Sequence, residues 1–277
     1  IYLLIIVAVY TVEMQPWPSA GFFLSSLLAW AAIGWGQFAL FNALHEGLHK
    51  RMGAPHREFV GLLLTAWPLG FSASYRQLHL NHHKFFGHPQ RDPDYNNYAN
   101  FPSHRRAFIA RLLLNISGIA AARQFLGMLG EGKAETSENT GGGFFPVIAT
   151  QLLLLGIFAA TAGWLYYFWL WLVPLATFAK FFTSTRTFCE HASPDNQAVI
   201  RTITGSFLGE KVFGVFNFHY HAEHHRFVGI PCSQLPRAHN QDGGQLFRQQ
   251  EAGTEHYEHF DRGYFGLLVG WYRALSP

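Results

Sequence analysis

The feature that most restricts how this chain can fold is a pair of long segments without a charged side chain. Residues 20–43 contain no Asp, Glu, Lys or Arg, and residues 144–179 contain none either. A helix needs about 20 apolar residues to cross a bilayer, so the first segment predicts one membrane-spanning helix. The second is long enough for two, and "TAGW" at 161–164 offers a turn between helices over 144–161 and 163–182. We expect Pro174 to kink the later helix.

The apolar start of the chain adds a fourth span. Residues 1–10, "IYLLIIVAVY", lack the basic leader of a signal peptide, and we expect residues 1–12 to be the remaining part of a spanning helix. Only 13% of the residues are charged, against about 25% in soluble proteins, which fits a lipid-exposed surface. The sequence therefore predicts an all-α membrane protein with four transmembrane helices in two hairpins, forming a single domain over residues 1–277.

The distribution of Lys and Arg predicts the orientation, because these residues accumulate in cytoplasmic loops. The short loops at 11–19 and 161–163 contain neither. The 20 basic residues then lie on the cytoplasmic side or at helix ends that face it. The two isolated cysteines, Cys189 and Cys232, fit this reducing side. A net charge of +3 without basic runs argues against a nucleic-acid partner.

Three further segments complete the expected organisation. Residues 59–73, "FVGLLLTAWPLGFSA", are too short to span and contain a proline, so they suit an interfacial or re-entrant segment. Residues 104–129 mix arginines with Leu, Ile and Phe, as an amphipathic helix in the headgroup layer does. Residues 130–143 form a flexible polar linker. We expect the remaining segments to form a helical cap on the cytoplasmic side.

Histidines recur in three short boxes on this predicted cytoplasmic side. The boxes are HEGLH (His45, His49), HLNHH (His79, His82, His83) and HAEHH (His221, His224, His225). Spacings of three and four residues place the rings of each box on one face of a helix, as a shared metal requires. A lone histidine is more often hydrogen-bonded or solvent-facing than a ligand. Two HxxHH boxes with one HxxxH predict a metal centre.

The number of histidines indicates which metals to expect. Eight imidazoles exceed what one ion can use, so two ions are the economical interpretation. Imidazole suits Zn, Cu, Fe or Ni. Structural zinc needs only four ligands, commonly with cysteine. A redox pair is therefore favoured, with iron as the first choice.

The boxes and the four-span scaffold resemble the membrane fatty acid desaturase and hydroxylase superfamily, from about residue 20 to residue 239. "HHKFFGHPQRDPDY" (82–95) looks like the family's second box with its Asp-Pro-Asp. "HAEHHRFVGIPCSQLP" (221–236) looks like the third box with the Pro-x-x-x-Leu-Pro run after it. One departure is Val228, where many members have proline.

The resemblance implies a non-haem di-iron centre with nine histidines and O2 as co-substrate. The ninth histidine would be His191 in "RTFCEHAS". On a helix, His219 would point about 160° away from His221, so we expect a structural role for it. Asn217 would lie on the ligand face and could orient a ligand or hold a water.

Two ferrous ions among neutral imidazoles have a charge of +4, which is costly to bury without compensation. Metal-bound histidines usually donate their outer N–H to a carboxylate or carbonyl. We expect this role for the acids in and near the boxes rather than ligation or base catalysis. These acids are Glu46, Asp92, Asp94, Glu190 and Glu223.

The resemblance implies an O2-dependent oxidoreductase that acts on an alkyl chain of a lipid. Desaturation of a fatty acyl or acyl-lipid chain is the leading hypothesis, and the five-residue first box fits acyl-lipid, ketolase and alkane-type members. The alternative is a hydroxylase or ketolase of a carotenoid, alkane or other hydrophobic substrate. A membrane metal transporter or sensor is more remote, because no predicted span contains a buried charge.

We expect the electrons to come from an external donor such as ferredoxin or rubredoxin with a reductase. The sequence contains no haem-binding His-Pro-Gly-Gly segment, and residues 226–277 leave little room for a fused cytochrome b5 or flavin domain. The basic cytoplasmic loops would dock such acidic donors, although they suit anionic lipid headgroups equally well. The expected location is an integral membrane protein with its active site on the cytoplasmic side.

Overall fold

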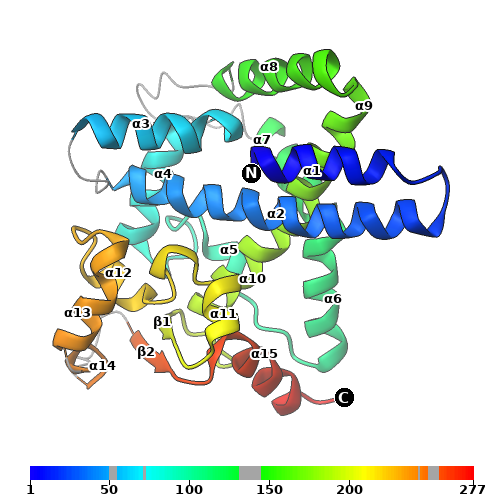
Figure 1. Ribbon diagram of the computed structural model, residues 1–277. Coiled ribbons are helices and arrows are strands. Elements are labelled where there is room, and N and C mark those ends of the chain that lie inside the picture. The colour runs from blue at the N-terminus through cyan, green and yellow to red at the C-terminus, as the bar shows by residue number, and fades with distance from the viewer. Residues whose placement is uncertain (50–54, 71–72, 131–144, 243, 249–255) are drawn as a thin grey trace. The chain divides into compact units, whose positions relative to one another are not determined.

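The computed structural model describes residues 1–49, 55–70, 73–130, 145–242, 244–248 and 256–277 as a mostly helical chain (Figure 1). The contacts divide the chain into two compact units. Unit 1 contains residues 1–41, 64–73 and 112–182, and unit 2 contains residues 42–63, 74–111 and 183–277. Each unit has its own buried residues.

Unit 1 consists of apolar helices. They include α1 (Tyr2–Glu13), α2 (Ala20–Leu48) as far as Phe41, η1 (Trp67–Leu69), α7 (Ile119–Gly130), α8 (Phe145–Thr161) and α9 (Trp164–Tyr167), with η2 (Phe168–Leu172), η3 (Leu175–Ala179) and the start of α10 (Lys180–His191). One buried cluster joins α1, α2 and η2 through Val12, Ile33 and Leu170. A second joins α8 to the helix that follows it, through Phe158 and Trp171.

A glycine permits α2 to lie close to η3. A Cβ atom on Gly34 would lie 2.4 Å from the Cβ atom of Phe178 and 3.0 Å from the backbone nitrogen of Ala179. Small residues allow such close backbone approach between apolar helices. The short connection between α8 and α9 depends on a second glycine, Gly163, whose φ of 109° is outside the range that other residues adopt readily.

Pro174 lies between two π-helical segments, η2 and η3, within helical chain that continues from Trp164 to His191. Proline lacks the N–H group that the α-helical pattern needs, and π-type turns are one way to accommodate the change. The helix extends well beyond the predicted end at residue 182. This extension brings the end of α10 into unit 2, where His191 lies.

Two helices within the described residues are long and apolar enough to cross a membrane, Ala20–Leu48 and Trp164–His191. The predicted spans at 1–12 and 144–161 correspond to α1 and α8, which are apolar but have 12 and 17 residues. At 1.5 Å per residue α8 is about 26 Å long, slightly less than the roughly 30 Å hydrocarbon core. The arrangement as four spans therefore stays a prediction.

The predicted interfacial segments differ in detail from the structure. The segment predicted at 59–73 begins earlier, as α3 (Pro55–Ala66), and is followed by η1. The single helix predicted over 104–129 is wrong: the structure has α6 (Arg105–Ile116) and α7, separated at Gly118 with φ 81°. Glycine adopts this backbone conformation without steric cost, which explains the break. The linker predicted at 130–143 lies outside the described residues, apart from Gly130.

Unit 2 contains short helices and one small sheet, so the all-α prediction is wrong in this respect. The helices include α4 (Ala73–Phe85), α5 (Tyr95–Tyr98), α11 (Phe207–Val212), η4 (Val215–Asn217), α12 (His221–Arg226), η5 (Cys232–Gln234), α13 (Leu235–Asp242), α14 (Gln245–Arg248) and α15 (Gly263–Ala274). Strands β1 (Val199–Ile203) and β2 (His256–Phe260) pair in parallel, with Val199 opposite His256. Every residue of β1 is buried, and Ile200 packs in one cluster with Ala222 of α12 and Leu246.

Candidate metal centre

Nine histidines of unit 2 lie close together, and their rings form two groups. The five-histidine group has one nitrogen from each ring within 4.8 Å of the others, and its members are His45, His49, His79, His83 and His224. The closest pair is Nε2 of His49 and Nε2 of His79, 2.7 Å apart. Nε2 of His83 lies 3.1 Å from Nε2 of His79 and 3.2 Å from Nε2 of His224. The group thus joins the end of α2 to α4 and α12.

The four-histidine group consists of His82, His191, His221 and His225. Nitrogens of His82, His191 and His225 lie within 4.8 Å of one another, and all three residues are buried. His221 joins them because its Nε2 lies 2.9 Å from Nε2 of His191. The solitary histidine at the end of α10 therefore lies among the box histidines, where the resemblance had placed it.

The two HxxHH boxes divide their rings between the groups in opposite ways. In α4, the i and i+4 residues, His79 and His83, belong to the five-histidine group, and the i+3 residue His82 belongs to the other. In α12, the i and i+4 residues, His221 and His225, belong to the four-histidine group, and His224 belongs to the five-histidine group. Each helix thus contributes to both groups.

Burial and the lack of hydrogen-bond partners make these rings suitable for metal. Burial lowers the pKa of His79, His221, His224 and His225 well below 6.5, and lowers the pKa of His83 to about 2. The rings are therefore neutral at pH 7, which is the form that binds a metal.

Several ring nitrogens of the histidines in the two groups lack a hydrogen-bond partner. Both ring nitrogens of His225 and Nδ1 of His45 and His83 are buried without a hydrogen-bond partner among the described residues. Buried polar atoms without partners are rare in proteins. A donor set made only of imidazoles fits two transition-metal ions, as the sequence predicts.

Asp92 accepts a hydrogen bond from the outer nitrogen of a predicted ligand. Its Oδ1 lies 2.9 Å from Nδ1 of His82, and its Oδ2 accepts hydrogen bonds from the hydroxyl of Tyr98 and from the backbone N–H of Gly87. Burial opposes the charged form of both partners. The hydrogen bond between them outweighs this, and it raises the pKa of His82 and lowers that of Asp92. Asp94 lies farther away, with Oδ2 3.8 Å from Nδ1 of His82.

Glu190 belongs to a buried network beside His221. Its Oε2 lies 3.5 Å from Nδ1 of His221, and its Oε1 accepts a hydrogen bond of 2.9 Å from the hydroxyl of Tyr264. Nε of Arg186 lies 2.8 Å and 3.0 Å from the two carboxylate oxygens. Arg186 also donates to the side-chain oxygen of Asn42. The charge of Glu190 is therefore compensated by a guanidinium within the same buried network.

Comparison with protein families agrees with this arrangement. A family model described as "Fatty acid desaturase" matches residues 21–252. The chain belongs to the fatty acid desaturase family. A comparison with curated proteins found no match. Membership of this family of lipid-chain oxidoreductases confirms the resemblance stated from the sequence, and the two histidine groups fit the metal chemistry of the family.

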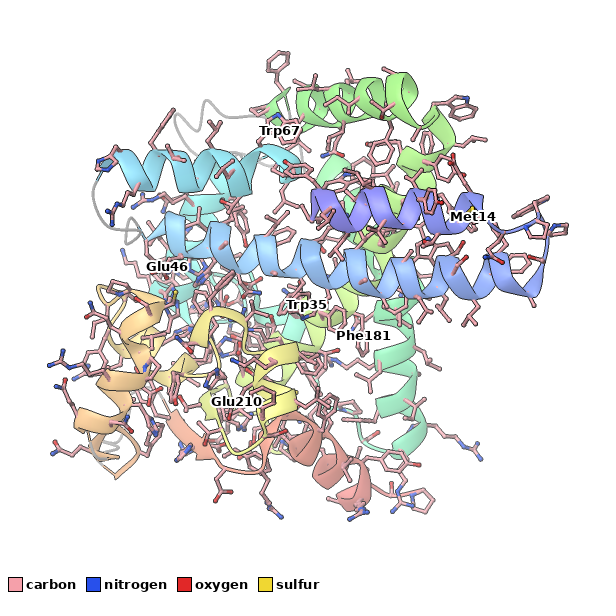
Figure 2. The ribbon with its side chains drawn as sticks, in the orientation of Figure 1. Met14, Trp35, Glu46, Trp67, Phe181 and Glu210 are labelled. Carbon is pink, nitrogen blue, oxygen red and sulfur yellow. The ribbon has the colours of Figure 1, made fainter. Side chains whose placement is uncertain are left out.

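The other acids of this family member contact groups outside the two histidine groups. Glu223 accepts hydrogen bonds from the hydroxyl of Thr202 and from Nδ1 of His239, the latter at 2.5 Å. Glu46, near the end of α2 (Figure 2), accepts a hydrogen bond of 2.9 Å from the backbone N–H of Cys232. Glu223 and Glu46 therefore link their own helices to other segments of the chain. Their predicted role toward the ligands stays a prediction.

Asn217 and His219 precede α12 instead of continuing it, so the helical placement predicted for Asn217 is wrong. Asn217 has φ 65°, and its side-chain nitrogen donates to the carbonyl of Cys232 at 3.3 Å. His219 donates from Nδ1 to the carbonyl of Gly214 at 3.3 Å and lies outside both histidine groups. The structural role predicted for His219 agrees with this contact.

The residues that hold these acids in place were not predicted from the sequence. Tyr98, Tyr264, Thr202 and His239 each donate to a buried carboxylate near the histidine groups. Tyr98 follows the Asp-Pro-Asp run closely, in "DYNNY", so its proximity was a signal. The other three are far in sequence from the acids that they contact.

Proposed function

We propose that this chain is an O2-dependent di-iron oxidoreductase that desaturates a fatty acyl or acyl-lipid chain. The observation that supports this proposal is the convergence of nine histidines into a five-membered and a four-membered group in a member of the fatty acid desaturase family. Iron is the metal that the family implies for such a centre, and the all-imidazole donor set is compatible with it.

The histidines would hold the two ions, and the carboxylates would set the charge around them. When bound, the ferrous ions supply the activation of O2 and the removal of hydrogen from an unactivated C–H bond. Burial keeps imidazoles such as His79 and His224 neutral, and Asp92 orients His82 through its hydrogen bond. Loss of two hydrogens from the substrate and reduction of O2 to two waters require two further electrons and two protons. Placement of the substrate carbon decides between desaturation and oxygen insertion.

The proposal includes an external electron donor of the ferredoxin or rubredoxin type with its reductase. Two ferrous ions would hold the two electrons for a single turnover, so repeated turnover needs a donor that returns two electrons to the centre each time. Purified protein loaded with iron should consume O2 in the presence of substrate only when such a donor, its reductase and NADPH are added. Substrate-dependent O2 consumption that persists with NADPH when the ferredoxin or rubredoxin and its reductase are omitted would reject this class of donor and leave the metal centre intact.

We also propose that α1, α2, α8 and the helix Trp164–His191 cross the membrane as two hairpins, with the histidine groups in a cytoplasmic cap. The uncharged segments and the absence of Lys and Arg from 11–19 and 161–163 support this orientation. Single cysteines introduced in place of Met14 and Ser206 in a Cys189→Ala, Cys232→Ala background test it. Impermeant maleimide added to intact cells should label position 14 and spare position 206.

The experiment that tests the reaction is mass spectrometry of total lipids from cells that express the protein with a ferredoxin and its reductase. Lipids lighter by two hydrogens are expected, and fragmentation would locate the double bond. Cells that express His82→Ala should lack the new lipid. The matched control is His88→Ala, because His88 is exposed and lies outside both histidine groups.

Each other outcome of this experiment has a definite meaning. Lipids heavier by one oxygen would reject desaturation and assign the chain to the hydroxylases or ketolases. Unchanged lipids in several hosts, together with metal uptake that depends on His82, would reject the enzyme and favour a transporter or sensor. Candidate carotenoids, alkanes and specialised lipids should be supplied before that conclusion is drawn.

A further inference from the structure

A carboxylate lies within hydrogen-bonding distance of the outer nitrogen of His82. Nδ1 of His82 lies 2.9 Å from Oδ1 of Asp92, and in the same group Nδ1 of His221 lies farther from its nearest carboxylate, 3.5 Å from Glu190. Nδ1 of His45, His83 and His221 and both ring nitrogens of His225 are buried without a hydrogen-bond partner among the described residues. The hydrogen bond between His82 and Asp92 therefore distinguishes His82 from these four histidines.

A buried tyrosine donates a hydrogen bond to each of these carboxylates. The hydroxyl of Tyr98 donates to Oδ2 of Asp92, and the hydroxyl of Tyr264 donates to Oε1 of Glu190 at 2.9 Å. Tyr98 is 3% exposed and Tyr264 is fully buried. A hydroxyl that donates to a carboxylate stabilises its negative charge, so less of that charge is available to another donor on the same carboxylate. Each tyrosine thus competes with a histidine for one carboxylate.

The competition matters more at Asp92 than at Glu190. Arg186 contacts both oxygens of Glu190 and compensates its charge whether or not Tyr264 donates. The described partners of Asp92 are His82, Tyr98 and the backbone N–H groups of Gly87 and Asp94, and no Lys or Arg of the described residues is among them. Tyr98 is therefore the main side chain that competes with His82 for Asp92.

We propose that Tyr98 is a positioning residue that limits the negative charge which Asp92 presents to His82, and that it thereby sets the metal affinity of the four-histidine group. This inference rests on the proposed metal centre. The backbone N–H groups of Gly87 and Asp94, 3.1 Å and 2.9 Å from the carboxylate oxygens, hold Asp92 in place without the Tyr98 hydroxyl. Loss of the hydroxyl strengthens the hydrogen bond from Nδ1 of His82 to Asp92, which makes Nε2 a stronger metal ligand.

The test compares Tyr98→Phe with Asp92→Asn in the full chain. The purified protein, in detergent, is stripped of metal and titrated with Co²⁺ against a competing chelator, with the visible absorption of bound Co²⁺ as the readout. We expect two Co²⁺ per wild-type chain. Asp92→Asn should weaken one of the two sites by about 10–100-fold, the usual effect of removing such a partner. Tyr98→Phe should strengthen the same site several-fold and leave the other unchanged.

Two further variants serve as controls. Tyr95→Phe changes another tyrosine of the short helix α5 and should leave both sites unchanged. Tyr264→Phe should alter the four-histidine site less than Tyr98→Phe does, because Arg186 remains beside Glu190. An effect of Tyr264→Phe equal to or larger than that of Tyr98→Phe would overturn the argument from charge compensation.

The direction of the change separates this role from simple support of the fold. If Tyr98 only held Asp92 in place, Tyr98→Phe would weaken the site that Asp92→Asn weakens. That result, an unchanged affinity, or an equal loss at both sites would each overturn the inference. Fewer than two Co²⁺ per wild-type chain would reject the proposed metal centre itself, which is a different failure.

Discussion

Replacement of Arg201 by methionine should loosen the end of α10 where His191 lies. Arg201 is 3% exposed in β1, and its Nη1 donates to the backbone carbonyls of Cys189 and Ala192, on either side of His191. Its Nε and Nη2 also lie 2.8 Å and 2.6 Å from Oε2 of Glu258 in β2. One side chain therefore joins the end of the helix to both strands of the sheet.

The expected size of the effect follows from the two carbonyls. Each buried carbonyl that loses its donor costs about 1–3 kcal/mol, so the substitution should cost about 2–6 kcal/mol. Glu258 is partly exposed, and loss of its ion pair adds little. A loss of about 2 kcal/mol in the free energy of local opening corresponds to about 30-fold faster amide exchange. Hydrogen exchange of the purified protein should show at least this acceleration at Cys189–Ala192 and in β1.

The matched control is Arg226→Met, at the exposed end of α12. It removes the same charge and should leave exchange at the end of α10 within about twofold of the wild type. Co²⁺ affinity of the four-histidine group should fall in Arg201→Met and stay unchanged in Arg226→Met. Exchange in Arg201→Met that stays within threefold of the wild type would refute the reasoning, because the carbonyls would then have found other donors.

Three other predictions concern the two histidine groups and the hydrogen bond between His239 and Glu223. His83→Ala and His224→Ala should each lose activity and bound metal but retain their helical content by circular dichroism. The control His219→Ala should keep both ions. Full activity of His83→Ala or His224→Ala would contradict the di-metal assignment. Removal of metal with a chelator should accelerate amide exchange in α4 and α12 by at least tenfold, and equal exchange with and without metal would mean that these helices are held by packing alone. The hydrogen bond to Glu223 raises the pKa of His239, although burial opposes this shift. Its stabilisation is then complete below pH about 6.5 and is lost as the pH rises through the higher folded-state value. Thermal unfolding should show this loss in the wild type but not in His239→Gln, and parallel pH profiles of the two proteins would count against it.

The histidine spacing was informative because it acts within one helix. Residues at i, i+3 and i+4 share a helical face whatever the rest of the fold does, and the structure brings all eight box histidines together. Spacing did not reveal which ring joins which group, because that depends on how α4 and α12 face each other. His191 could be assigned only through the resemblance, since one histidine in "CEHAS" has no periodicity of its own.

The remainder of the site depends on contacts between distant parts of the chain. Tyr264 lies 74 residues from Glu190, and Arg201 lies 57 residues from Glu258. No local pattern distinguishes these side chains from other tyrosines and arginines. The small sheet was missed for the same reason, since β1 pairs in parallel with a strand more than fifty residues later. The break at Gly118 is different, because a glycine within a predicted helix was visible and tertiary packing decided its effect.

The opposite division of the two HxxHH boxes has a consequence for how sequences of this kind can change in length. A residue inserted into an α-helix rotates every later side chain by about 100° relative to the earlier ones. One extra residue between His79 and His82 would therefore turn a ligand away from each group at once, whereas a substitution removes a single ligand. Loops between the helices have no such restriction, whereas α10, which lies between the second and third boxes, has it because it contains His191. Insertions and deletions should be tolerated in the loops between these helices and excluded within the boxes and within α10.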